Sequence, residues 1–146
     1  MLRQYADRGV FRGFSESTRS QGVQEFRFTW LTREPMRLRY DRTAASLTFV
    51  GLLPGVARAS PLLADVLALV ESRHARTLPA HRRLDKRRAT VECSYRRGSL
   101  SLVLHAKGGN HAYAAQKGVN LVNEIFTLLQ ASYPEYLWDT FGVPAE

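Results

Sequence analysis

Apolar residues near the C-terminal end of the chain recur at helical spacing and predict its longest helix. Between Asn110 and Phe141 they return every three or four positions, so one face of the helix is apolar. Asn110 follows two glycines and is suited to cap the start, and Gly142 is suited to end the segment. Pro134 should bend or restart the helix, because proline lacks the backbone N–H that a helix interior requires. The stripe comprises Val122, Ile125, Phe126, Leu129 and Tyr133, and Leu121 and Leu128 widen it.

Earlier in the chain, apolar and polar positions alternate, and this pattern predicts β-strands. Three alternating segments, at residues 24–31, 36–41 and 46–50, are separated by short turns. Consecutive strands joined in this way form an antiparallel meander. The alternation indicates that one face of the meander meets a core and that the other is exposed or contacts a partner.

A second helix and a β-hairpin lie between the meander and the long helix. Ser60-Pro61 predicts the helix start, because serine is a good N-cap and proline suits the first helical position. Residues 91–95 and 100–104 alternate in the manner of strands, and Arg97-Gly98 between them is a tight hairpin signal. The first of these strands carries the single cysteine, Cys93, on the same face as apolar neighbours.

These elements predict an α+β fold in the order (α)βββαββα. We expect a five-stranded antiparallel sheet, built from the three-strand meander plus the hairpin, with the helices packed on one side. The whole chain, residues 1–146, suits one domain. Residues 24–141 form its α+β core, and residues 1–22 are a weakly structured N-terminal segment whose first residues fit either a short helix or a loop, because Gly9 and Gly13 interrupt the helical pattern.

Composition narrows the setting in which the protein works. The 146 residues contain no apolar run of the roughly 18 residues that a membrane span needs. Residues 1–22 lack an apolar stretch typical of a secretory signal, so we expect no signal peptide. Cys93 has no second cysteine to pair with, which fits a reducing compartment. We therefore expect a cytoplasmic protein without a membrane span.

The net charge of +8 is the strongest compositional signal. A basic chain attracts polyanions, whether nucleic acid, an anionic membrane or an acidic protein. The charge is concentrated between Arg73 and Arg88, whereas no Lys or Arg follows Lys117. Aromatic residues are not interleaved with these arginines, although Arg37 and Arg39 add charge on a strand face predicted to be exposed. The candidate polyanion-binding residues are Arg82, Arg83, Lys86, Arg87, Arg88, Arg96 and Arg97.

Catalytic and metal-binding patterns do not emerge from the sequence. Cys93 reads as a small core residue rather than a reactive thiol. Residues 107–110 precede a helix and could hold an anion, but they read more simply as a strand-to-helix turn. We expect no enzyme activity, no cofactor and no metal. The histidines, none in a metal-ligand pattern, are His74, His81, His105 and His111.

The long helix carries a further pattern, Leu121-Val122-Asn123-Glu124, then Leu128-Leu129, Tyr133-Pro134 and Leu137. Together with the order of elements over residues 24–141, it resembles the YbjN-like proteins, whose fold is shared with type III secretion chaperones. The resemblance implies helix, three strands, helix, two strands and helix. It also implies a non-enzymatic, often dimeric protein that binds and holds partner proteins, and it brings no catalytic residues.

The sequence therefore favours a protein-binding module, chaperone-like or regulatory, that forms a homodimer. A nucleic-acid-binding protein using the basic residues is the alternative. The residues do not identify the partner or the pathway. The predicted partner or dimer interface is the apolar surplus of the long helix, namely Ile125, Phe126, Tyr133, Tyr136, Leu137, Trp138 and Phe141.

Overall fold

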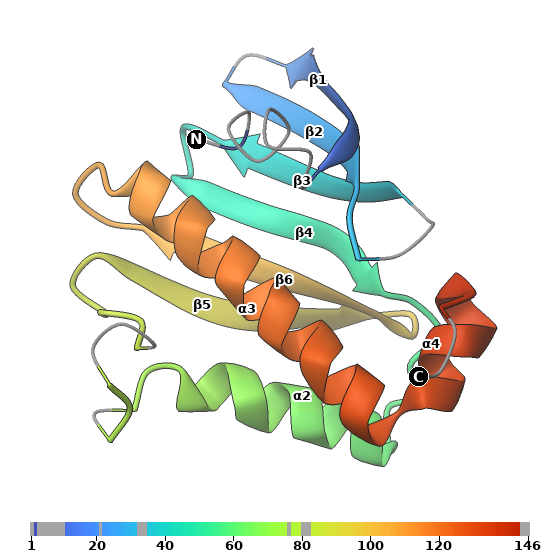
Figure 1. The fold of residues 1–146 in the computed structure, drawn as a ribbon. Coiled ribbons are helices and arrows are strands. Elements are labelled where there is room, and N and C mark those ends of the chain that lie inside the picture. Colours follow the sequence, from blue (N-terminus) through green and yellow to red (C-terminus); the bar gives the residue numbers. More distant parts are fainter. Residues whose placement is uncertain are drawn as a thin grey trace.

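The described part of the chain forms an open antiparallel sheet that a long helix crosses on one face, with a second helix beside the sheet and a short third helix beyond its end (Figure 1). This computed structural model describes residues 2, 11–20, 22–31, 35–75, 77–79 and 83–143. The strands are β1 Arg12–Ser20, β2 Val23–Thr29, β3 Pro35–Asp41, β4 Ser46–Leu53, β5 Ala89–Arg96 and β6 Ser99–Ala106. The helices are α2 Pro61–Ser72, α3 His111–Ser132 and α4 Pro134–Phe141.

The sheet runs in the order β1-β2-β3-β4-β6-β5, and every pair of neighbours is antiparallel. The predicted meander corresponds to β2, β3 and β4, and the predicted hairpin to β5 and β6. The hairpin joins the meander through β6, so its first strand becomes an edge of the sheet. The α+β class and the antiparallel sheet are confirmed.

The prediction of five strands is wrong, because β1 adds a sixth at the other edge of the sheet. Residues 15–20 were expected to belong to a poorly ordered segment, since they are polar throughout. An edge strand that is polar on both faces shows no alternation of apolar and polar residues, so its sequence does not identify it as a strand. It forms because a neighbouring strand offers backbone groups with which it can pair. Here the neighbouring strand is β2, with Glu16 opposite Phe26 and Ser17 opposite Glu25. The predicted short helix before Gly9 falls mostly outside the described residues.

α3 crosses the face of the sheet and closes one hydrophobic core (Figure 1). Its buried side chains, from Ala114 to Leu129, meet the inward face of β4 and β6. Gly118 lets the helix approach closely, because a Cβ there would lie 3.0 Å from both Leu104 Cδ1 and Phe49 Cε2. α2 packs beside β5, and α4 packs against the end of α3.

The helix ends follow the predicted signals with one exception. The Ser60 hydroxyl accepts a hydrogen bond of 3.3 Å from the Leu63 amide, as an N-cap should. Pro134 restarts the chain as α4, and Gly142 ends it in the left-handed conformation. Asn110 occupies the cap position of α3, but its side chain makes no capping bond to that helix.

Among the described residues, no helix has both the length and the apolar character needed to cross a bilayer.

Gly118→Val should lower the free energy of unfolding by about 1–3 kcal/mol, because its methyl groups would overpack the contact with Leu104 and Phe49. Urea unfolding measures the difference. Gln116→Val is the matched control, since Gln116 is exposed on the same helix and the control carries the helix propensity of valine without the clash. Equal stability of the two variants would contradict the close approach of α3.

Candidate functional site

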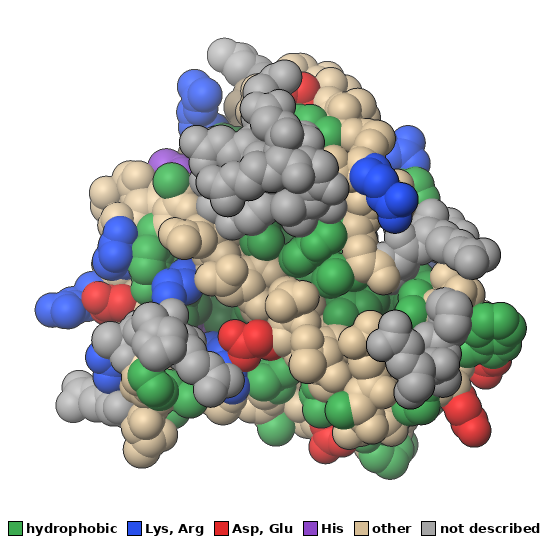
Figure 2. All heavy atoms as spheres, viewed as in Figure 1, with side chains coloured by type: hydrophobic (Ala, Val, Ile, Leu, Met, Phe, Trp, Pro, Cys, Tyr) green, Lys and Arg blue, Asp and Glu red, His purple; other side chains and the backbone are tan. Residues whose placement is uncertain are grey.

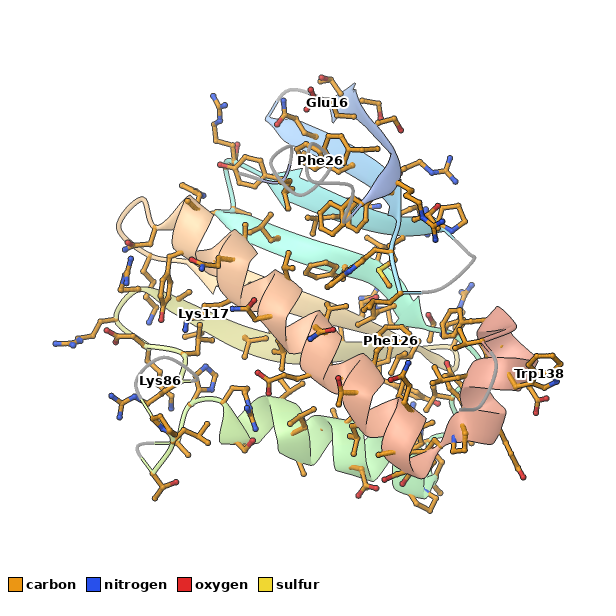
Figure 3. The ribbon with its side chains drawn as sticks, viewed as in Figure 1. Glu16, Phe26, Lys86, Lys117, Phe126 and Trp138 are labelled. Atoms are coloured by element: carbon orange, nitrogen blue, oxygen red, sulfur yellow. The ribbon has the colours of Figure 1, made fainter. Side chains whose placement is uncertain are left out.

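A basic cleft lies between residues 83–88 and the first turns of α3. The cavity has a volume of about 740 Å³. Figure 2 shows Lys and Arg side chains gathered on this side of the molecule, and Figure 3 shows Lys86 and Lys117 there, far from Trp138. We call this cavity the basic cleft. It is lined by His74, Arg83, Leu84, Asp85, Lys86, Arg87, Arg88, Tyr113 and Lys117.

Residues 83–88, which we call the basic segment, are held in place by one buried leucine and by backbone hydrogen bonds. Leu84 is only 4% exposed and joins the core, and its amide donates to the Arg73 carbonyl over 2.7 Å. The amide of Asp85 donates to the Tyr113 hydroxyl over 3.0 Å. The amide of Arg88 then donates to the Asp85 carbonyl. The first two bonds attach the basic segment to the end of α2 and to α3. They therefore fix the position of the backbone that carries its Lys and Arg side chains.

Tyr113 brings an aromatic ring into the cleft. The Arg88 guanidinium lies 3.8 Å from the centre of this ring, and the Lys117 ammonium lies 5.5 Å from it. Arg88 Nε also donates to Asn110 Oδ1 over 3.3 Å. A cation over an aromatic face is stabilised by the ring quadrupole. Arg88 is therefore oriented by its neighbours, while Asn110 serves this contact rather than the helix cap.

Asp85 is the one carboxylate among the described lining residues, and it is engaged with Arg87. Its Oδ1 accepts from the Arg87 amide over 3.0 Å and from Arg87 Nε over 3.3 Å. The side-chain hydrogen bond from Arg87 lowers the pKa of the Asp85 carboxyl. Against this one negative charge stand five cationic side chains, so the cleft is strongly positive. They are Arg83, Lys86, Arg87, Arg88 and Lys117.

His74 closes one side of the cleft from the end of α2. Burial, with Lys86 as a second cause, lowers the pKa of His74 below its ordinary value of 6.5. Its Nε2 is buried and meets no hydrogen-bond partner among the described residues. His74 is therefore mostly neutral at pH 7 and contributes shape and hydrogen-bonding capacity rather than charge.

A smaller cavity of about 290 Å³ adjoins the basic cleft, and the two share Leu84 and Lys117 as walls. We call it the inner pocket. An ion pair between Arg73 and Glu124 links α2 to α3 at this pocket. The remaining lining residues are Leu104, Asn120, Leu121 and Asn123. Its walls thus combine apolar side chains with amide and charged groups.

The structure brings together only part of the predicted polyanion-binding set. Arg83, Lys86, Arg87 and Arg88 line the basic cleft. Arg82 falls outside the described residues. Arg96 and Arg97 do not line this cleft, because β5 separates them from Arg88 by more than about 20 Å of extended chain.

Sequence reasoning missed the contributions of α2 and α3 to this cleft. Tyr113 and Lys117 are distant in sequence from residues 83–88, and His74 was considered as a possible metal ligand. Tyr113 and Lys117 are four positions apart on a predicted helix, so they share a face. That spacing was the available signal, but nothing local indicated that this face would meet the basic segment.

The predicted interface residues of the long helix mostly serve the core of the chain. Ile125, Phe126 and Leu137 are each at most 3% exposed, so they present no surface to a partner. Phe141 packs against Phe126 with ring centres 5.7 Å apart. Trp138 is the exception at 59% exposed, and it points away at the end of the molecule (Figure 3).

The two tyrosines of this set are anchored to neighbouring elements. Tyr133 donates its hydroxyl proton to Asp65 on α2. Tyr136 donates to the Pro54 carbonyl, and burial raises its pKa to about 12. Both hydroxyls thus fasten α4 and the end of α3 to the body of the chain.

The remaining candidate residues have structural partners. Cys93 is half-buried and packs against the core rather than within it, and burial raises the pKa of its thiol to about 11. His105 Nε2 lies 3.1 Å from Glu92 Oε1, and His111 Nδ1 lies 3.1 Å from the Tyr40 hydroxyl. His81 falls outside the described residues. Among those described, no three His, Cys, Asp or Glu side chains are grouped as a metal site would require.

Two further predicted features lie outside the basic cleft. Arg37 and Arg39 are half-buried on the sheet face that bears no described helix. Residues 107–110 form a turn closed by a 3.1 Å hydrogen bond from the Asn110 amide to the Lys107 carbonyl. This bond uses the amide that an anion would need, in agreement with a plain strand-to-helix turn.

Tyr113→Phe should loosen the basic segment, because it removes the hydroxyl that accepts from the Asp85 amide but keeps the ring under Arg88. We expect faster hydrogen exchange at the Asp85 amide and a loss of about 0.5–1.5 kcal/mol in unfolding free energy. Exchange followed by NMR measures the first effect. Tyr95→Phe is the control, since its hydroxyl bonds the distant Val56 carbonyl. Unchanged exchange at Asp85 would refute the anchoring role of Tyr113.

No protein-family model, curated protein or solved structure matches this chain. The resemblance to the YbjN-like proteins therefore stays a prediction. The described order also differs from the one that the resemblance implies, since four strands precede α2.

Proposed function

We propose that this protein binds nucleic acid through the basic cleft and acts without enzymatic activity. The single observation that carries the proposal is the convergence of five cationic side chains and Tyr113 on one cavity of about 740 Å³. Phosphate groups need positive charge and hydrogen-bond donors, and Arg and Lys supply both. The only described lining carboxylate, that of Asp85, is already engaged with Arg87.

Three of the five cations are open to a ligand from outside the chain. Lys86, Arg87 and Arg88 are exposed, and the Arg87 side chain is 90% exposed despite its contact with Asp85. Like charges so close together repel one another, and a bound polyanion relieves that repulsion. A polymer of phosphates also fits a net charge of +8.

The presence of Tyr113 favours nucleic acid over other polyanions. The sequence showed no aromatic residue among the arginines, but the fold supplies one from α3. Arginine planes and aromatic rings are surfaces on which nucleobases stack. A cytoplasmic location is part of the proposal, because nucleic acid is present there and the unpaired Cys93 suits it.

Lys86→Gln combined with Arg87→Gln should weaken binding to single-stranded RNA and reduce its salt dependence. The logarithm of the binding constant falls as the logarithm of the salt concentration rises. Each lost phosphate contact makes this slope shallower by about 0.7, so the loss of two contacts makes it shallower by about 1.4. Fluorescence anisotropy at several salt concentrations measures the slope.

The matched control is Arg96→Gln combined with Arg97→Gln, which removes the same charge at the far end of β5. Its slope should stay that of the unmodified protein. Equal losses in both double variants would argue against the basic cleft. Absence of salt-sensitive binding by the unmodified protein would remove the proposal altogether.

A second candidate is protein binding through a homodimer, as a chaperone-like or regulatory adaptor. The observation that favours it is Trp138, the most exposed large hydrophobic side chain of the described residues. Tryptophan is enriched at the energetic centres of interfaces. The candidate carries less weight than the cleft, because three of the other predicted interface residues are buried in the core.

Trp138→Ser should shift a dimer to monomer while leaving the fold intact, since the side chain is 59% exposed. Light scattering at high micromolar concentration measures the mass. Leu67→Ser, which changes another exposed apolar residue on α2, is the control and should leave the mass unchanged. A monomeric unmodified protein would rule out this candidate.

A further inference from the structure

We infer that the cleft accepts one unpaired nucleotide, with its base in the inner pocket and its phosphate in the basic cleft. The inference rests on the proposed function and adds the form in which the nucleic acid is recognised. It follows from the junction of two cavities of different character, about 290 Å³ and about 740 Å³, that share Leu84 and Lys117.

The inner pocket has the chemistry that a nucleobase requires. Leu84 and Leu121, each 4% exposed, supply the small apolar part of its wall against which a base can pack, and Leu104 is fully buried at the same pocket. Asn120 and Glu124 supply hydrogen-bonding groups at the edges. Amide side chains pair with the donor and acceptor atoms of adenine, and carboxylates accept from the amino group of cytosine. Such edges are read when a base is splayed out of its stack.

Three polar groups of the pocket, Lys117, Asn120 and Glu124, come from one stripe of α3 that begins at Tyr113 in the basic cleft, whereas Arg73 comes from the end of α2. Tyr113, Lys117, Asn120 and Glu124 follow one another at intervals of three or four residues and thus lie along one side of the helix. The stripe leads from the basic cleft to the inner pocket. Glu124 is held there by Arg73, which is itself almost buried. A ligand that follows the stripe meets cations first and amide groups next.

Lys117 marks the boundary between the two parts. Its side chain lines both cavities, and its ammonium lies 5.5 Å from the Tyr113 ring centre. A phosphate beside Lys117 would be within the reach of the cations of residues 83–88 on the cleft side. The order of groups along the ligand, phosphate and then base, matches the order of groups along the protein.

A duplex does not offer a base in this way, because its bases are stacked and paired. The inference therefore selects single strands, strand ends or free nucleotides, which share the same base-and-phosphate chemistry. The experiment separates these sources by comparing a strand with a mononucleotide.

The test uses the full chain and four fluorescent or competing probes. They are labelled single-stranded adenosine and cytidine homopolymers, an abasic strand with the same number of phosphates, and free adenosine monophosphate as a competitor. Asn120→Ala is the test variant, since Asn120 is exposed on α3 and alanine favours the helix. Gln116→Ala is the matched control on the same helix, outside the lining residues of both cavities.

We expect at least one homopolymer to bind about tenfold more tightly than the abasic strand. Asn120→Ala should remove most of that advantage without weakening the abasic strand, and Gln116→Ala should change neither. Competition by adenosine monophosphate near the affinity of the strand would identify a free nucleotide as the ligand. Competition only at far higher concentration would identify the strand, and both results support the base pocket.

Two results would overturn the inference, and they differ in what they leave standing. If the abasic strand binds as tightly as both homopolymers, and binding still depends on Lys86 and Arg87, the phosphate site stands and the base pocket is refuted. If no strand binds at low salt, the proposed function fails and the base pocket fails with it.

Discussion

The contact of α3 with the sheet is the constraint on which the rest of the structure depends. Gly118 lies so close to Leu104 and Phe49 that no Cβ fits there without displacing a neighbour. Glycine costs about 1 kcal/mol relative to alanine inside a helix, so its place in α3 is explained by this approach. Because the apolar face of α3 is turned fully onto the sheet, the flanking stripe from Tyr113 to Glu124 is turned toward α2 and the basic segment. The core thereby orients the candidate site.

Leu84 has the complementary role within the basic segment. It is the buried residue between Arg83 and Asp85, and its amide bonds the end of α2. Without such an anchor, a run of like charges would be expected to extend into solvent. With it, the cations on either side are directed into one cleft, where Tyr113 and Lys117 from α3 meet them. Burial of the Leu84 side chain thus holds a highly charged segment against α2 and α3, where it forms one wall of a positively charged cleft.

Local sequence patterns predicted well the helices and strands that bury one face, because such elements carry apolar residues at regular spacing. The meander, the hairpin, the Ser60 cap and the restart at Pro134 all follow from spacing or turn chemistry within a few residues. The sixth strand was not predictable in this way, because β1 is a polar edge strand whose partner is supplied by β2. Ile125 and Phe126 looked like surplus apolar surface, since the sequence does not show how much of the sheet α3 covers.

The sequence by itself determined the α+β class, the apolar face of α3, the excess positive charge and most of the basic residues around the cleft. Those are properties of composition and of spacing along one element. Only the tertiary structure decided which charges act together: it separated Arg96 and Arg97 from Arg88 along β5, and it brought Tyr113 and Lys117 to the basic segment. The physical reason is that a cleft is formed by elements distant in the chain, and their meeting depends on packing of the shared core rather than on any local pattern.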